Sequence, residues 1–251
     1  MRKIGFSGKL SSMNKVNTRG GEGVSVQSLF EAGAHFGFVK SRRHPSAKPF
    51  IFGVKNKIEI FDLEKTKTQL ETALEFVKGL ASKSGQILFV SGKNEARESI
   101  SSTAESINMP FVAGRFIGGT LTNFPEIRKR VEKMETLVSQ KEKGELAKYT
   151  KKERLLIDRE IAKLHSFFFG ISVMKRLPQA IFVVDAKKEA IAVKEAKKMG
   201  IPVMALCGSD NDMEGVDYPI PANDSSKASI SYFLKQIAGA YQAGQMSKPT
   251  V

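Results

Sequence analysis

The stretch Ala180-Ile-Phe-Val-Val-Asp185 decides the fold, because it is a continuous apolar run that ends in an aspartate. A run of this length without polar alternation is typical of a strand that is buried on both faces. It leads into residues 189–199, which have the apolar spacing of a helix, and residues 201–207 form a second buried run. Buried strands that alternate with amphipathic helices predict an α/β fold, with a parallel sheet covered by helices on both faces.

The alternation continues toward both ends of the chain. Residues 57–62 alternate in polarity as a half-buried strand does, and residues 86–90 form a short apolar run. The expected helices are residues 25–36 with Ser25 as N-cap, residues 63–83, residues 94–107 and residues 225–243.

Residues 125–169 interrupt this pattern, because they carry no strand signal. Gly144 is placed to end one helix, and Thr150-Lys-Lys-Glu153 is a capping box that begins another. We therefore predict an inserted antiparallel helical hairpin of coiled-coil type, with arms of about 19 residues and a reach of roughly 28 Å. We expect its apolar seam to pack mainly on itself. The residues of the seam are Ile127, Val131, Met134, Val138, Ile157, Ile161, Leu164 and Phe168.

The charge of the chain predicts an acidic partner. Lys and Arg number 40 against 26 Asp and Glu, which gives a net charge of +14 and a pI near 9.8. Nucleic acid is the first candidate and an anionic membrane surface the second. No apolar run approaches the roughly 18 residues that a membrane-spanning helix needs, so we expect no membrane partner.

Cysteine and histidine usage argues against a metal site. The single Cys207 cannot form an intramolecular disulfide. Because it lies in an apolar run, we expect it to be a small apolar side chain buried in the core. His35, His44 and His165 are scattered, and the sequence has no HExxH or CxxC motif. We expect no metal, no cofactor and no small-molecule substrate.

Polar residues at predicted strand ends leave two interpretations open. Ser91-Gly-Lys-Asn94 follows a strand but lacks the phosphate-binding GxxxxGK[ST] pattern. Asp185, Ser209 and Asp210 lie where an open α/β sheet binds ligands, yet such residues also cap helices and close turns. We favour the second interpretation, since no base or metal ligand accompanies them, and predict no catalytic residue.

Two basic segments predict a surface that binds polyanions. Arg115-Phe-Ile-Gly-Gly-Thr-Leu-Thr-Asn-Phe124 places two adjacent glycines between an arginine and neutral hydrogen-bonding side chains. Its Phe116 and Phe124 either anchor the loop in the core or stack on an unpaired base, and we favour anchoring. Residues 40–57 carry six basic residues and no acid, with prolines between them. We expect an exposed loop in which replacing Arg42 and Arg43 by glutamate hardly affects folding.

The predicted RNA-binding residues come from these segments and from the hairpin. They are Lys40, Arg42, Arg43, His44, Lys48, Lys55, Lys57, Arg115, Thr122, Asn123, Arg128, Lys129, Lys151 and Lys152.

The predicted domain organisation follows from the breaks in these patterns. Residues 1–23 contain basic residues and serines, which suits a transit peptide or a basic arm that lies on nucleic acid. We expect the arm. The α/β domain comprises residues 24–124 and 170–244, the inserted hairpin residues 125–169, and a C-terminal tail residues 245–251.

The ordered motifs resemble those of the bacterial-type small-subunit ribosomal protein S2 family. Besides the double-glycine loop, they are Leu29-Phe-Glu-Ala-Gly-Ala-His-Phe-Gly37, Lys48-Pro-Phe-Ile-Phe-Gly53, Asn56-Lys-Ile-Glu-Ile-Phe-Asp-Leu-Glu-Lys-Thr66, Ile87-Leu-Phe-Val90, Thr150-Lys-Lys-Glu153, Leu177-Pro-Gln-Ala180, Val183-Val-Asp-Ala186, Gly200-Ile-Pro-Val203 and Gly215-Val-Asp217.

The resemblance implies a flavodoxin-like sheet with an inserted coiled-coil hairpin. It also implies a structural constituent of the small (30S) ribosomal subunit that has no catalytic role and binds 16S rRNA and neighbouring ribosomal proteins. In many bacteria these neighbours include ribosomal protein S1. A cytoplasmic ribosome is expected in preference to an organellar one. The residues that carry the family motifs are His35, Gly37, Arg115, Gly118, Gly119, Thr122 and Asn123.

The sequence departs from the family pattern at three places. The usual HFGH ends in Phe38, the usual Asp-Thr-Asn after Leu206 becomes Gly208-Ser-Asp210, and the tryptophan beside the double glycine is Phe116. Two other functions compete with the ribosomal one: a flavodoxin-like nucleotide or flavin enzyme with a basic surface, and a free-standing RNA-binding or adhesion protein.

Overall fold

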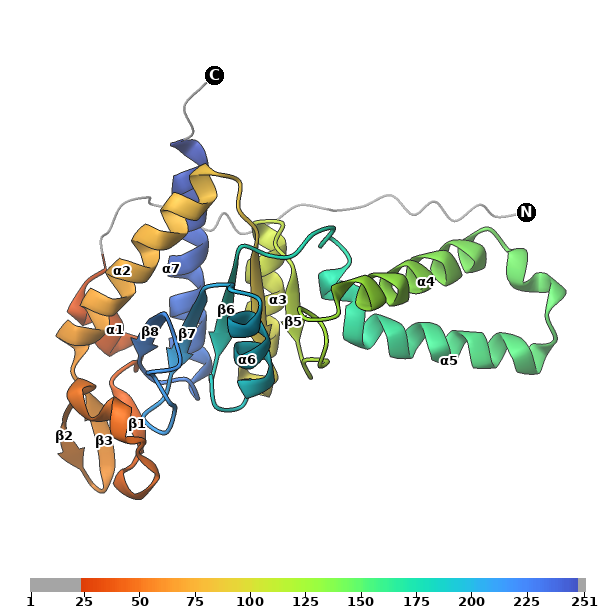
Figure 1. Cartoon of the computed structure of the whole chain (residues 1–251). Helices are drawn as coiled ribbons and strands as arrows, with labels where there is room; N and C mark the ends of the chain where they lie inside the picture. Colours follow the sequence, from red (N-terminus) through yellow and green to blue (C-terminus); the bar gives the residue numbers. More distant parts are fainter. Residues whose placement is uncertain (1–23, 248–251) are drawn as a thin grey trace, which may run out of the picture.

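A computed structural model describes residues 24–247 of the protein (Figure 1). Residues 1–23 and 248–251, which include the predicted basic arm and the end of the predicted tail, lie outside the described residues.

The centre of the fold is a parallel sheet in which five strands have the order β5-β4-β6-β7-β8. Numbered along the chain within this sheet, the order is 2-1-3-4-5, which is that of flavodoxin-like folds. The predicted α/β fold with a parallel sheet is confirmed. The bounds of the strands are Ile87–Ser91 for β4, Phe111–Ala113 for β5, Ala180–Val184 for β6, Val203–Cys207 for β7 and Tyr218–Pro221 for β8.

Helices cover both faces of this sheet because successive strand side chains point to opposite sides. In β4, Ile87 and Phe89 join one core cluster, whereas Leu88 and Val90 join the other. The first cluster lies under α2, α3 and α7, and the second lies under α6 and the base of the hairpin (Figure 1). These helices span Leu63–Ser82 (α2), Asn94–Ser106 (α3), Ala190–Lys198 (α6) and Lys227–Met246 (α7).

A smaller antiparallel sheet with the order β1-β3-β2 precedes the main sheet. The expectation of an exposed loop over residues 40–57 is wrong, because the segment contains two 3-10 helices and strand β2. The predicted helix over residues 25–36 is too long: α1 stops before Gly33, which has φ +71, and β1 follows. The bounds are Val26–Glu31 for α1, Phe36–Val39 for β1, Lys40–Arg42 for η1, Pro45–Phe50 for η2, Ile51–Lys55 for β2 and Ile58–Phe61 for β3.

Helices α4 (Phe124–Glu142) and α5 (Lys151–Phe168) run antiparallel and project away from the sheet beside β5 (Figure 1). Gly144 has the left-handed φ of +75 that ends a helix. The predicted capping box is confirmed, since the Thr150 hydroxyl accepts from Glu153 N and the Glu153 carboxylate accepts from Thr150 N. Short 3-10 turns follow each arm, at Glu145–Lys148 (η3) and Phe169–Ile171 (η4).

The base of the hairpin belongs to the core of the sheet. Ile127, Val131, Leu164 and Phe168 are buried in the same cluster as the β4 and β6 side chains. Helices α4 and α5 also pack on each other, as expected of the apolar seam, and at this end the seam continues into the core cluster. Farther out, ion pairs join the two arms, between Lys133 and Glu160 and between Lys141 and Asp158.

Across residues 24–247, none of the helices combines the length and the apolar character needed to cross a membrane.

We predict that replacing residues 138–156 by a short Gly-Ser turn leaves a cooperatively folded body, because this segment lies beyond the buried base of the hairpin. Phe168→Ala, by contrast, should lower the free energy of unfolding by about 3 to 5 kcal/mol, since it removes a buried ring. Thermal melts of both variants test the pair of statements. A shortened protein without a cooperative transition would show that the distal arms complete the core.

Candidate nucleic-acid interface

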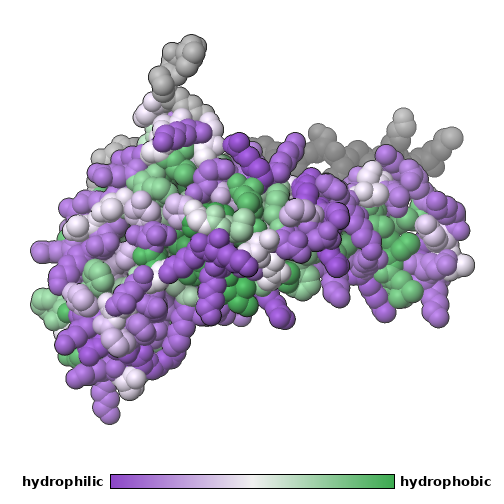
Figure 2. Space-filling model, viewed as in Figure 1, coloured by the Kyte–Doolittle hydropathy of each residue, from purple (hydrophilic) through white to green (hydrophobic). Residues whose placement is uncertain are grey.

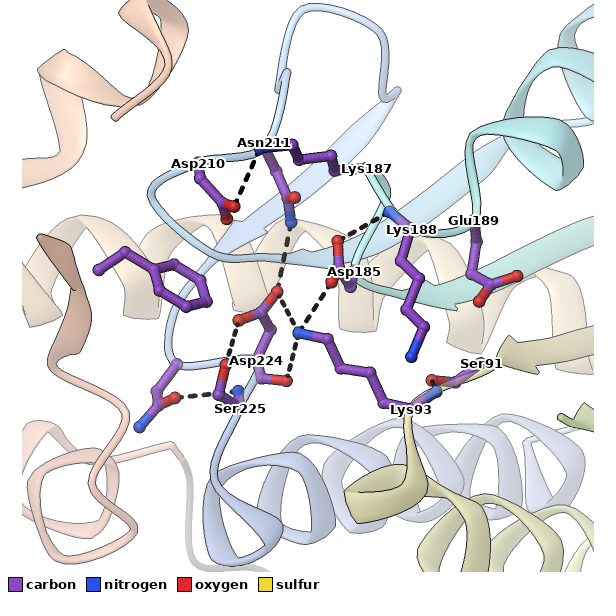
Figure 3. Close-up of polar contacts among 12 residues, drawn as sticks. Ser91, Lys93, Asp185, Lys187, Lys188, Glu189, Asp210, Asn211, Asp224 and Ser225 are labelled. Atoms are coloured by element: carbon purple, nitrogen blue, oxygen red, sulfur yellow. Dashed lines mark hydrogen bonds and ion pairs between the residues drawn. The ribbon is translucent and has the colours of Figure 1, made fainter. Parts of the chain in front are cut away.

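Lys93 joins the carboxyl ends of three strands of the main sheet (Figure 3). It follows β4, and its ammonium nitrogen lies 2.9 Å from Asp185 Oδ2, after β6, and 2.9 Å from Asp224 Oδ2, after β8. The ammonium also donates to the backbone oxygen of Asp224 at 3.0 Å. Since a lysine has three donors, this site uses all of them within the chain.

Burial and charge act against each other in this cluster. The side chain of Asp224 is 1% exposed and that of Lys93 is 11% exposed. Burial lowers the pKa of Lys93, but the combined attraction of Asp224 and Asp185 outweighs it, so the pKa lies above its ordinary value. Burial raises the pKa of Asp224, and the attraction of Lys93 offsets this only in part.

The remaining polar groups at this edge are also bonded within the chain. Asp185 accepts from Lys188 N, Ser209 accepts from Phe38 N, and Asp210 accepts from Arg42 and Lys187. The contact of Asp185 closes a turn, as the favoured interpretation expected, whereas Ser209 and Asp210 bind residues that are distant along the chain. Among the residues that the structure describes, no group of three His, Cys, Asp or Glu side chains is arranged to hold a metal ion.

Two of the departures noted in the sequence, Phe38 and Gly208, lie against each other. A Cβ atom at Gly208 would lie 2.9 Å from Phe38 Cε2 and 2.8 Å from Asp224 Oδ1, closer than real Cβ contacts. The Phe38 ring also carries the Arg42 guanidinium at 4.7 Å from its centroid. The large side chain at position 38 and the missing side chain at position 208 therefore form one packing arrangement.

The double-glycine loop binds an anion, but the anion is a carboxylate of the same chain. Glu195, on α6, accepts hydrogen bonds from Gly119 N at 2.5 Å, Leu121 N at 3.0 Å and Thr122 N at 3.1 Å. It also accepts from the Thr122 hydroxyl at 3.2 Å. Gly119 has φ +92, a left-handed value that suits glycine. Sequence reasoning missed Glu195, since nothing near it along the chain marks it as a partner of the loop.

The exposed side of the same loop retains polar groups. Arg115, Thr122 and Asn123 are exposed, whereas Phe116 is 5% exposed and joins the core. The anchoring interpretation of Phe116 is confirmed. Phe124 also packs against that cluster while remaining partly exposed.

The basic residues of the 40–57 segment divide into paired and unpaired groups. Arg43 Nη1 lies 3.0 Å from Oε1 of Glu59, which is 0% exposed, and Arg42 pairs with Asp210 at 3.2 Å. The expectation that both arginines tolerate glutamate is wrong for Arg43, since the change would leave the Glu59 carboxylate buried without its counter-ion. Lys40, Lys48, Lys55 and Lys57 are exposed and have no carboxylate partner within residues 24–247.

The other predicted residues vary in the same way. His44 Nδ1 is bonded to Ser46, Arg128 to the Ser172 backbone oxygen and to Glu132, and Lys129 to Glu126. Lys151 and Lys152 are exposed in the first turn of α5. The predicted residues thus occupy the small sheet, the glycine loop and the hairpin and do not converge on one site. Figure 2 shows hydrophilic residues spread over the small sheet and the hairpin on the visible face.

Comparison with known proteins gives one family. The model of the family described as ribosomal protein S2 matches residues 29–244. The chain is 43% identical over 222 residues to small ribosomal subunit protein uS2 of Coprothermobacter proteolyticus, a match that covers 88% of this chain and 83% of that protein. It is 42% identical over 225 residues to uS2 of Porphyromonas gingivalis (90% and 80% covered) and 44% identical over 222 residues to uS2 of a Roseiflexus species (88% and 85% covered).

We predict that Lys93→Met destabilises the protein by about 3 to 5 kcal/mol at neutral pH, because it leaves the buried Asp224 carboxylate without a counter-ion. Burial already holds the pKa of Asp224 above its ordinary value, so the folded state binds this proton more tightly than the unfolded state does. The deficit of the variant relative to the wild type should therefore be smallest at low pH and grow as the pH rises through that raised pKa. Thermal melts of both proteins from about pH 4 to 7 measure this, and an equal deficit at every pH would refute it.

We also predict that Glu195→Ala costs about 2 kcal/mol, since it removes the charged acceptor of the glycine loop. The amide protons of Gly119, Leu121 and Thr122 should exchange faster with solvent. The exchange of the β6 amides should change only by the amount that the lower global stability of the variant accounts for. Lys198→Ala, at another position on α6, is the control. Unchanged exchange of the loop amides would mean that the loop holds its shape without Glu195.

Proposed function

The chain belongs to the ribosomal protein S2 family, whose members are structural proteins of the small ribosomal subunit and not enzymes, and from this premise we propose that it binds 16S rRNA through its exposed basic residues. The observation that carries the proposal is the set of exposed lysines of the 40–57 segment that have no carboxylate partner within the described residues. An unpaired exposed ammonium gains most from a phosphate, because binding requires no internal ion pair to break. Affinity would arise from phosphate neutralisation and from shape, with little base recognition.

The proposed interface consists of the predicted residues that are exposed and whose side chains have no partner within the described residues. Lys40, Lys48, Lys55 and Lys57 contribute from the small sheet, Arg115 and Asn123 from the glycine loop, and Lys151 and Lys152 from the hairpin. Arg42, Arg43, His44, Thr122, Arg128 and Lys129 have partners within the chain and would contribute by holding these segments in place.

The proposal extends to the organisation of the chain and to its neighbours. We propose that the hairpin of residues 125–169 packs as a coiled coil and touches rRNA, and that residues 1–23 act as a basic arm. The protein partners would be neighbouring small-subunit proteins, including ribosomal protein S1, in a cytoplasmic ribosome. Against a flavodoxin-like nucleotide or flavin enzyme stands the switch point between β4 and β6, where such ligands bind and which the ion pair of Lys93 with Asp185 fills.

We predict that the protein sediments with the small subunit and that its affinity for 16S rRNA falls by orders of magnitude between about 50 and 200 mM salt. Replacing Lys40, Lys48 and Lys55 together by glutamine should reduce the slope of log affinity against log salt by roughly two to three. The melting temperature should hardly change, because these lysines make no internal ion pair within the described residues.

The matched control is glutamine at Lys78, Lys83 and Lys235, three exposed lysines of the α2 and α7 layer. It removes the same charge from another part of the surface. Equal loss of slope in both triple variants would mean that only net charge matters, and a salt-independent affinity of the wild-type protein would refute the electrostatic proposal.

A further inference from the structure

A cavity of about 420 Å³ opens between α6 and the segment that connects β1 to β2. This volume lies within the range of about 300 to 1,000 Å³ in which proteins bind small ligands. Three small or apolar side chains line it, those of Ala186, Ala190 and Val193. In Figure 1, α6 lies on the visible face, and Figure 2 shows hydrophilic and hydrophobic residues side by side over it.

Cationic side chains surround this apolar lining. Lys187, Lys194 and Lys197 come from the α6 side, and Arg42 comes from the facing segment. Two acids also line the cavity. Asp210 is 6% exposed and already paired with both Arg42 and Lys187, and Asp212, whose side chain is 60% exposed, lies 4.0 Å from His44 Nδ1 on the facing wall.

Lys194 and Lys197 supply the free charge of the cavity. Both are exposed and have no carboxylate partner within residues 24–247. The Lys197 ammonium nitrogen lies 3.3 Å from the point where a Cβ of Gly215 would stand, so this side chain reaches across the cavity wall formed by that glycine.

An apolar lining with a cationic border selects the chemistry of the occupant. Inorganic phosphate would use the lysines and leave the apolar surface exposed to water, whereas a nonpolar molecule would leave the lysines without a partner. A nucleotide satisfies both, because its flat base has apolar faces and its phosphate carries the charge. A base inside a duplex is stacked and paired and cannot enter, so the cavity fits a nucleotide that is unpaired.

We propose that this cavity takes one unpaired nucleotide of an RNA strand. The base lies against Ala190 and Val193, and the phosphate lies against Lys194 and Lys197. The inference rests on the proposed function and deepens it, since it gives one base-contacting position to an interface that otherwise neutralises phosphates. The segment that lines the opposite wall, through Arg42 and His44, is continuous with exposed Lys40 and Lys48, so a strand bound along it passes the cavity mouth.

The experiment follows the Ala190 and Val193 methyl signals of the full-length protein by NMR during titration with a short oligouridylate, a short RNA duplex and uridine monophosphate. The oligouridylate should shift these signals, the duplex should leave them in place, and the monophosphate should bind at least tenfold more weakly than the oligonucleotide. Ala190→Phe, which fills the cavity, should weaken oligouridylate binding by about tenfold and leave duplex binding unchanged.

A charge variant keeps the test independent of any folding defect in Ala190→Phe. Replacing Lys194 and Lys197 by glutamine should reduce the salt slope of oligouridylate binding by about 1.4. Lys198→Gln is the single-site control, because Lys198 is exposed on the same helix and does not line the cavity. The salt slope of oligouridylate binding to Lys198→Gln should fall by less than half of the decrease seen in the double variant.

Each contrary outcome has its own meaning. Oligouridylate that binds without shifting the methyl signals would overturn the nucleotide assignment and leave rRNA binding intact. If uridine monophosphate saturates the cavity with an affinity equal to or higher than that of the oligouridylate, the ligand is a free nucleotide and not part of an RNA strand. Failure of 16S rRNA itself to bind would overturn the proposed function together with this inference.

Discussion

Within residues 24–247, the ammonium of Lys93 is the one group that joins the loops after β4, β6 and β8 at the carboxyl edge of the main sheet. Parallel strands end at the same edge, and their following loops diverge, so nothing in the backbone ladder holds those loops together. Lys93 after β4 binds carboxylates that follow β6 and β8 and thereby links the loops that lead into α3, α6 and α7. Because Asp224 is buried, loss of this ion pair would be strongly destabilising: a buried carboxylate is stable only while its counter-ion stays in place.

Further contacts attach the small antiparallel sheet to the same edge. Ser209 accepts from Phe38 N, and Asp210 binds Arg42, so the loop after β7 holds both ends of the turn that follows β1. Phe38 fills the space that a side chain at position 208 would need. The position of the basic segment therefore depends on the polar edge of the main sheet, although the two are far apart along the chain.

The sequence predicts the parts of the fold whose signals are local. The apolar runs of β4, β6 and β7, the capping box at Thr150 and the left-handed Gly144 are each visible within a few residues. Strand β5 has only three residues, too few to show a strand pattern in the sequence. Strand β8 contains two prolines, which are tolerated because it lies at the edge of the sheet, but which hide its strand pattern. The candidate site is less predictable still. Composition indicates a basic surface, but the pairing of Arg43 with Glu59 or of the glycine loop with Glu195 is a product of topology.

The pairing of charges also explains which basic residue types are left for a partner. Within the segment from Lys40 to Lys57, the two arginines are held by carboxylates of the chain, and the lysines are exposed. The planar guanidinium presents several donors in a fixed geometry and suits an ion pair that must hold a loop in one position, whereas the ammonium is a compact charge on a flexible stem. Because the arginine pairs fix this segment before binding, a polyanion that met the lysines would order side chains but little backbone. Less conformational entropy would then be lost on association, and more of the electrostatic attraction would remain as affinity.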